Sequence, residues 1–225
     1  MKLLIGVFLC IASLRLCAYT KEHIQVSITF RDQSLQLNHT YKLAGIQDVK
    51  IHTLKFYLGE FEFLKGQQVM KKNEGTYYLI DWSEADDSGM TIPLEKIPEG
   101  ADHLTGLLGV DSSLEVQGVQ RGALDPLKGM YWSWQSGYIH FKVEGVLTDS
   151  NGQKKDFQYH LGGYRSPWAV KKCLGIRRNG DCFILRFDIA PWLQEVLFNY
   201  PLHNMEPGME SKQLQELLIQ TLNPS

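Results

Sequence analysis

The residues of this chain best suited to chemistry are two tryptophans and a small set of histidines. Trp132 and Trp134 lie two positions apart, on the same side as Met130 if the segment is extended. Such an indole pair is typical of a packed core or of a platform on which a ligand stacks. Imidazoles bind metals and carry protons, and His140 and His160 lie close by in the sequence. No Ser/His/Asp order, glycine-rich phosphate loop or paired acid motif accompanies them, so we predict that the chain is not an enzyme.

The histidines are placed by a predicted hairpin of two strands, over 137–147 and 157–161, joined by a turn at 150–152. Apolar and polar residues alternate along both strands, which is typical of a sheet with one buried face. A three-residue turn that ends in a left-handed glycine sets the register. The apolar faces then match in the pairs Phe141–Leu161 and Val143–Tyr159. In this register His140 and His160 share the outer face, where two solvated surface histidines would also fit.

The side on which the tryptophans lie depends on the continuity of this strand. If the chain runs from Trp132 to His140 without a break, the indoles fall on the polar side, opposite the apolar face. A bulge at Ser136-Gly137 would instead return them to the core. The indoles therefore either join the core through a bulge or stand away from it, where they are available for binding.

The elements that must position these residues are strands. A period of two dominates from Ile24 onward, and Gly, Asn and Asp turns separate short segments, which indicates an all-β fold. The predicted strands cover 24–30, 49–58, 75–81, 88–94, 137–147, 157–161 and 183–189. Residues 211–219 have helical spacing after a serine. We predict one domain over residues 19–225, a β-sandwich of the immunoglobulin-like or Greek-key type with a short C-terminal helix.

Composition is that of an ordinary globular chain. Of its 225 residues, 44% are hydrophobic and 21% are charged, which excludes a disordered or low-complexity protein. The 23 Lys and Arg residues nearly balance the 25 Asp and Glu residues. Nucleic acid is therefore not an expected partner, because it usually requires a basic face.

Residues 1–18 have the features of a secretory signal peptide. Lys2 precedes the apolar run 3–14, which is too short to span a bilayer, and Ala18 offers a small residue for cleavage. We therefore predict an exported protein with no stable membrane insertion after removal of the signal. A retained membrane anchor is the alternative interpretation.

Removal of this signal leaves two cysteines, Cys173 and Cys182. An even number of cysteines in an exported protein favours a disulfide. Asn179-Gly180 between them is a strong signal for a hairpin turn. A two-residue turn there would put Cys182 opposite Arg177, so we expect a longer or bulged loop that lets the disulfide close.

Gly129–Tyr138, which carries both tryptophans, is the most specific of several segments that form one pattern along the chain. The weaker segments are Leu54–Leu58, Gly109–Ser112, Gly122–Pro126, His160–Gly163 and His203–Gly208. Together, and in this order, these segments resemble the MbnP-like family. The resemblance covers nearly the whole chain after the signal peptide. It implies a periplasmic protein of the kind found with methanobactin operons and, more widely, beside di-haem peroxidase-like proteins.

The resemblance further implies a copper-binding protein whose site is matured by oxidation. In such proteins a di-haem cytochrome c peroxidase-like partner converts a tryptophan to kynurenine, and the aromatic amine of kynurenine can bind a metal. An unmodified indole N–H can only donate a hydrogen bond. By position, the resemblance assigns the ligands to His160, His203 and either Trp132 or Trp134, with Met205 as a thioether donor. Imidazole suits copper, and soft ligands favour Cu(I) in particular.

Two other hypotheses stay open beside this one. In the first, the chain is a substrate or docking partner of a di-haem protein, and copper is incidental. In the second, the chain is a β-sandwich recognition module whose Trp132 and Trp134 stack on a sugar or a peptide. Conversion of a tryptophan in the native protein would favour the first over the second.

Overall fold

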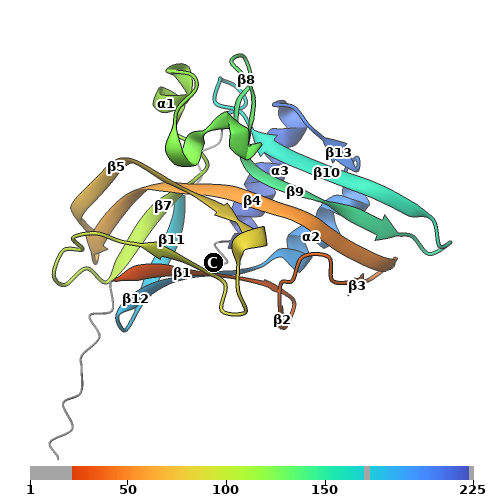
Figure 1. Cartoon of the computed structure of the whole chain (residues 1–225), viewed down its shortest axis with the longest axis horizontal. Coiled ribbons are helices and arrows are strands. Elements are labelled where there is room, and N and C mark those ends of the chain that lie inside the picture. Colours follow the sequence, from red (N-terminus) through yellow and green to blue (C-terminus); the bar gives the residue numbers. More distant parts are fainter. Residues whose placement is uncertain (1–21, 170–172, 223–225) are drawn as a thin grey trace, which may run out of the picture.

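The computed structural model describes residues 22–169 and 173–222, which fold into strands with three α-helices (Figure 1). The strands are β1 (His23–Phe30), β2 (Gln33–Ser34), β3 (Tyr41–Leu43), β4 (Ile46–Lys65), β5 (Gln68–Asp81), β6 (Met90–Pro93), β7 (His103–Leu108), β8 (Tyr131–Ser133), β9 (Gly137–Thr148), β10 (Lys154–Gly162), β11 (Cys173–Asn179), β12 (Cys182–Asp188) and β13 (His203–Asn204). The helices are α1 (Ser112–Val116), α2 (Ile189–Asn199) and α3 (Met209–Leu222), with short 3-10 helices η1 (Trp82–Glu84), η2 (Gly122–Leu124) and η3 (Pro126–Lys128). The predicted all-β class with a short C-terminal helix is confirmed.

The described strands form one large mixed sheet in the order β13-β10-β9-β4-β7-β11-β12-β1-β2. The β1–β12 and β10–β13 pairs are parallel. The long central strand β4 pairs with β9 along its first half and with β7 along its second half. The sheet curves back on itself, because Phe56 and Phe63 of β4 contact the rings of Phe187 and Phe183 of β12. The main core therefore lies between two layers of strands (Figure 1).

Two helices support the inner face of β9 and β10. Trp192 of α2 is fully buried, with its ring 5.5 Å from that of Phe141 and 5.8 Å from that of Tyr159. Its indole N–H donates to the Leu214 carbonyl of α3, which ties the two helices together. α2 begins at Ile189, and the side chain of the preceding Asp188 caps its first turn. The outer face of β9 and β10 is thus presented on a rigid support.

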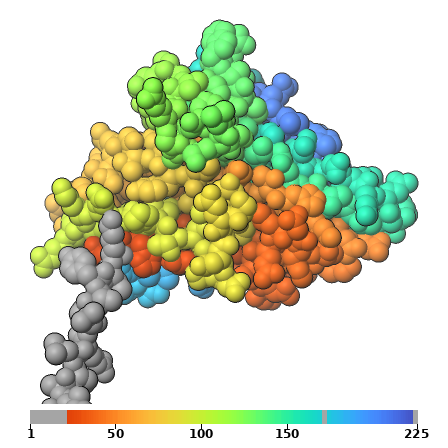
Figure 2. All heavy atoms as spheres, viewed as in Figure 1, coloured from red at the N-terminus to blue at the C-terminus, as the bar shows by residue number. Residues whose placement is uncertain are grey.

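Residues 109–136 rise from the other face of the sheet and are called the cap (Figures 1 and 2). The cap contains α1, η2, η3 and β8. Between the cap and the sheet lies a second apolar cluster, formed by Tyr57, Tyr77, Val110, Leu124, Met130, Tyr138 and Ile139. The sheet is therefore covered on both faces at this point, and the double-tryptophan segment belongs to the cap.

The predicted hairpin of β9 and β10 has the predicted register. The observed pairs include Phe141–Leu161 and Val143–Tyr159. Gly152 has a φ of +77°, so the turn ends in the left-handed glycine that the sequence indicated. Alternation of polar and apolar residues was sufficient here, because one face of each strand packs on the main core.

The hairpin contains a β-bulge at His140, and not at Ser136-Gly137 where the sequence analysis allowed one. Leu161 faces Phe141, but the next residue, Gly162, faces Ile139, which leaves His140 as the extra residue. Phe141 packs in the main core, whereas Ile139 packs in the second cluster. The tryptophan segment beyond the bulge therefore stands away from the main core, which decides between the two alternatives that the sequence left open.

The predicted disulfide between Cys173 and Cys182 is not formed, and the strand register explains why. β11 and β12 are joined by a two-residue turn at Gly180-Asp181, so Cys182 pairs with Asn179. Cys173 lies at the opposite end of β11, where it pairs with Leu107 of β7. At about 3.3 Å per residue the two ends of β11 are about 20 Å apart. A disulfide needs Cα atoms within about 7 Å of each other.

The predicted signal peptide, residues 1–18, lies outside the described residues. Over 22–169 and 173–222, the structure contains no helix with both the length and the apolar character needed to cross a membrane. Export to the periplasm therefore stays a prediction at this point.

Candidate metal site

β10 gathers most of the predicted ligands on one face. His160 lies on its outer face, because Tyr159 and Leu161 on either side pack in the main core. β13 runs parallel to β10 and places His203 opposite Gln158. From the spacing of strands and the rise along them, the Cα atoms of His160 and His203 are about 8 Å apart on this face.

The segment after β13 continues beside β10. A side-chain carbon added at Gly163 would lie 3.2 Å from Pro207, so the chain from His203 to Pro207 follows β10 to its end. Met205 follows Asn204, which pairs with Tyr159 of β10, and 48% of it is exposed. The structure thus brings a thioether and a second imidazole to the neighbourhood of His160.

His160 is only 5% exposed and is anchored by Glu144. Its Nε2 lies 2.7 Å from Glu144 Oε1, and Lys142 Nζ lies 3.4 Å from the same oxygen. Burial and the nearby Lys142 charge lower the pKa of His160, although the Glu144 hydrogen bond opposes them. Burial tends to raise the pKa of Glu144, but the His160 hydrogen bond and the Lys142 charge outweigh it and leave this pKa lowered. His160 is therefore a neutral imidazole near pH 7, and its Nδ1 is the ring nitrogen left for a metal.

Trp132 lies one step further along the same face of β10. A side-chain carbon at Gly162 would meet Cζ3 and Cη2 of the Trp132 ring at 2.8 and 3.1 Å, so the indole rests on this glycine. Gly162 follows His160 by two positions and therefore shares its face. The Trp132 Nε1 is buried and has no hydrogen-bond partner among the described residues. A buried donor without an acceptor costs roughly 1–3 kcal/mol, so packing alone does not explain why the Trp132 Nε1 is buried without one.

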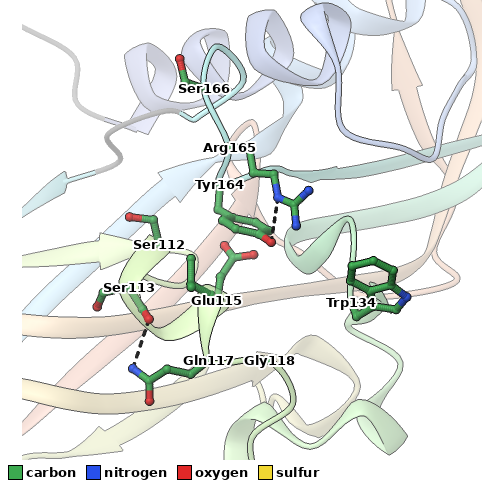
Figure 3. Close-up of a pocket in the computed structure, with 10 residues that line it drawn as sticks. Ser112, Ser113, Glu115, Gln117, Gly118, Trp134, Tyr164, Arg165 and Ser166 are labelled. Atoms are coloured by element: carbon green, nitrogen blue, oxygen red, sulfur yellow. Dashed lines mark hydrogen bonds between the residues drawn. The ribbon is translucent and has the colours of Figure 1, made fainter.

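Trp134 has a different environment from Trp132. It is 72% exposed and lines a groove of about 770 Å³ between α1 and residues 164–166. Figure 3 shows Trp134 across this groove from Tyr164 and Arg165, which are joined by a 3.0 Å hydrogen bond. Of the two tryptophans that the sequence left open, Trp132 is the one whose ring rests on β10, against Gly162 and two positions after His160.

The remaining surface histidines have partners elsewhere on the molecule. His52 Nδ1 lies 2.6 Å from Asn38 Oδ1, and His103 Nδ1 lies 2.5 Å from Asp102 Oδ1. Across the part of the chain that the structure describes, no group of three or more His, Cys, Asp and Glu side chains could hold a metal ion. The donors along β10 and β13 are thus an anchored imidazole, an exposed imidazole and a thioether, which are ligand types that suit copper. The unmodified Trp132 indole N–H can only donate a hydrogen bond.

The sequence analysis missed one pair of buried polar residues beneath the cap. His140 Nε2 lies 2.5 Å from Glu115 Oε1, and both side chains are almost fully buried. The sequence placed His140 on the outer face but could not provide its partner, because α1 lies outside the strand pattern. A glutamate buried in a five-residue helix has no periodic signal that would mark it.

The sequence matches the MbnP family over residues 20–201, which is most of the chain. The chain belongs to the MbnP family. Its fold is similar to that of MbnP from Methylosinus trichosporium, with a TM-score of 0.51, 15% sequence identity and 77% of each chain covered. A comparison with curated proteins found no match. The MbnP match includes Trp132 and His160, whereas His203 and Met205 lie beyond it.

Proposed function

We propose that this MbnP-family protein binds copper in the periplasm through His160 and through Trp132 after its oxidation to kynurenine. The family is associated with copper, and its members are extracellular or periplasmic. One observation carries the assignment to these residues. The Trp132 ring, whose buried Nε1 has no hydrogen-bond partner among the described residues, rests on Gly162, two positions after a neutral, carboxylate-anchored His160 on β10. In this role the protein is a binding protein and not an enzyme.

The conversion of Trp132 changes the chemistry of its nitrogen. An indole N–H has no lone pair in the ring plane and only donates a hydrogen bond. In kynurenine the nitrogen becomes an aromatic amine whose lone pair can bind a metal. Because the Trp132 ring rests on Gly162, two positions after His160, we expect the new amine to reach a metal bound by His160. Copper is then held by nitrogen ligands, which suit it.

The oxidation needs a partner, for which we propose a di-haem cytochrome c peroxidase-like protein that uses hydrogen peroxide. The indole loses four electrons and gains two oxygen atoms from water as its C2–C3 bond opens. Those electrons reduce two molecules of peroxide to water at the partner. Hydrolysis of the resulting formyl group then releases formate and leaves the amine. No residue of this chain is required as the oxidant.

His203 and Met205 complete the proposed site from the β13 side. Both lie on the exposed margin of β10, so they can move toward a metal more easily than His160 can. A thioether favours copper in its reduced state, which makes Cu(I) the expected form. Glu144 holds the His160 ring in position, as carboxylates behind metal-binding histidines do.

The experiment that tests this proposal compares copper binding before and after conversion. Protein isolated from its native periplasm is digested with trypsin, and the peptide 129–142 is fragmented to locate a gain of one oxygen and a loss of one carbon. We expect the change at Trp132. Converted and unconverted protein are then titrated with Cu(I) in competition with a chelator. Equal affinities in the two states would show that copper is incidental and that the chain is only a docking partner.

Matched substitutions assign the ligands. W132F removes the residue that is converted, whereas W134F changes an exposed tryptophan two positions away in the same peptide. We expect W132F to bind copper no better than unconverted protein and W134F to keep the gain that follows conversion. The reverse result would move the modified residue to Trp134.

A second candidate function is favoured by the exposure of Trp134. An indole that is 72% exposed beside a groove can stack on a sugar or a peptide side chain, with Arg165 as a polar neighbour. Unlike the recognition module expected from sequence, this platform uses Trp134 without Trp132, because Trp132 faces β10. Screening the wild type and W134A against glycan and peptide arrays tests it, and identical binding patterns would reject it.

A further inference from the structure

A buried acid and a buried imidazole meet where the cap joins the sheet. Glu115 on α1 is 3% exposed, and His140 on β9 is 2% exposed. Glu115 Oε1 lies 2.5 Å from His140 Nε2, and Glu115 Oε2 accepts the backbone N–H of Tyr138 at 3.0 Å. Both carboxyl oxygens of this one side chain are therefore used to hold β9.

Two glycines make room for this pair. A side-chain carbon at Gly137 would lie 2.0 Å from Glu115 Oε2, and one at Gly109 would lie 2.7 Å from the His140 ring. Both glycines have a positive φ, +77° for Gly137 and +112° for Gly109, and residues with a side chain rarely adopt such values. The two glycines at the ends of the cap thus leave the space that the Glu115 and His140 side chains occupy, so this contact is a specific feature of the fold.

The pair holds the short hairpin that carries Trp132. β8 is only three residues long, and its ladder to β9 consists of the pairs Tyr131–Tyr138 and Ser133–Gly137, with an irregularity between them. One further hydrogen bond joins the Ile139 N–H to the Met130 carbonyl. So short a ladder is weak on its own. Glu115 fixes the β9 side of this hairpin at Tyr138, the residue to which Tyr131 pairs.

We propose that Glu115 and His140 are positioning residues that hold the β8–β9 hairpin so that Trp132 rests on β10 beside His160. Glu115 connects the hairpin to the cap, and His140 connects the carboxyl group to the sheet. The significance of this position rests on the proposed copper site, but the position itself can be measured in metal-free, unconverted protein.

A polar pair suits this task better than apolar packing does. A buried carboxyl group and imidazole have one low-energy arrangement, because any other leaves a polar group without a partner. An apolar contact of the same size tolerates small rotations and slides. The indole of Trp132 must stay over one glycine, so an arrangement with a single geometry is the useful one.

The test measures the protection of Trp132 in metal-free protein. Full-length unconverted protein is treated briefly with N-bromosuccinimide, which oxidises accessible indoles, and the tryptic peptide 129–142 is analysed by fragmentation. In the wild type we expect exposed Trp134 to react first and Trp132 to react slowly. E115A removes both hydrogen bonds, and we expect the rate at Trp132 relative to Trp134 to rise at least about tenfold, a factor that corresponds to a modest loss of local stability. E115Q keeps an oxygen for the Tyr138 N–H and an amide for His140, so we expect it to restore most of the protection.

The control separates positioning from general destabilisation. W82F removes another buried hydrogen bond, from Trp82 Nε1 to the Leu35 carbonyl, at a distant part of the sequence. We expect W82F to lower the unfolding midpoint without exposing Trp132. If W82F exposes Trp132 as much as E115A does, or if E115Q is as exposed as E115A, the positioning role is overturned.

Copper titration of the converted variants then distinguishes this inference from the proposed function. We expect E115A to bind copper more weakly than E115Q and the wild type. If the converted wild type does not bind copper, the proposed function fails, while the protection data still decide the role of the pair. If the wild type binds copper and E115A binds it equally well with Trp132 exposed, the positioning role stands, Trp132 is not a ligand and the proposed copper site fails at that residue.

Discussion

Substitution of Gly162 by alanine tests the geometry on which the candidate site depends. The added Cβ would lie 2.4 Å from the Tyr138 carbonyl oxygen and 2.8 Å from Cζ3 of the Trp132 ring. The backbone of Gly162 is held against moving away from the Trp132 ring, because Ser211 and Gln215 of α3 form hydrogen bonds with its N–H and carbonyl groups. The indole and the β8–β9 hairpin must therefore move.

The size of the effect follows from overpacking. Forcing one methyl group into a filled site costs roughly 1–3 kcal/mol, and the contact with backbone oxygen places this case in the middle of that range or above. For a chain of this length a loss of about 2 kcal/mol lowers the melting temperature by about 4–8 °C. We also expect converted G162A to bind copper at least about tenfold more weakly, because the ring no longer lies beside His160.

Gly175 provides the matched control. It lies within β11 and has no positive φ, and no atom of the described residues, its two chain neighbours aside, lies within 4 Å of a side-chain carbon added there. Urea unfolding followed by circular dichroism compares the two variants. We expect G175A to change the free energy of unfolding by no more than about 0.5 kcal/mol. Equal stability of G162A and G175A, with unchanged protection of Trp132, would refute the placement of the indole on β10.

Three further predictions test the site and the fold. H160A lowers the Cu(I) affinity of the converted protein at least about tenfold, whereas H52A, at a surface histidine bound to Asn38, leaves it unchanged in the same chelator competition. In metal-free protein the free energy of unfolding falls as pH drops below about 6.5, because the pKa of His160 is lowered on folding and the unfolded chain takes up the proton first. Urea unfolding on either side of this pH checks it, and an H160Q variant with the same slope contradicts it. C173S and C182S each change the free energy of unfolding by less than about 0.5 kcal/mol, since loss of a real disulfide would cost about 2–5 kcal/mol.

The sheet could be predicted from sequence where each strand has one buried face. β9 and β10 show this best, because Phe141, Val143, Tyr159 and Leu161 alternate with polar residues and fix both the strands and their register. The parallel pairings of β1 with β12 and of β10 with β13 could not be predicted, since nothing local specifies a partner so distant in sequence. β7 and β11 were missed, because each is short and contains a glycine that weakens the strand pattern.

The site could be predicted only in part, for a related reason. The family motif indicated His160 and the double-tryptophan segment, and the structure places the Trp132 ring on Gly162 of β10, two positions after His160. Whether the indoles join the main core depended on a bulge at His140, whose position no periodic pattern reveals. The partner of His140 came from a five-residue helix in the cap. Long-range polar contacts of this kind arise from the tertiary fold and not from local propensity.

The disulfide prediction fails because the turn in the β11–β12 hairpin is tighter than expected. Gly180 has a φ of +60°, and a two-residue turn at Gly180-Asp181 places Cys182 at the turn end of the hairpin. Cys173 then has the whole length of β11 between it and that turn. An even cysteine count in an exported chain was a sound reason to expect a bridge, but strand geometry decides whether two cysteines can meet.

The central claim is tested most directly by locating copper in the converted protein. A crystal of this form, loaded with Cu(I), is measured at the copper absorption edge so that anomalous scattering marks the metal. The account predicts one strong peak on the outer face of β10, within bonding distance of His160 Nδ1 and of the amine derived from Trp132. A peak remote from both residues, or a peak at the same place in protein whose Trp132 is unconverted, would contradict it.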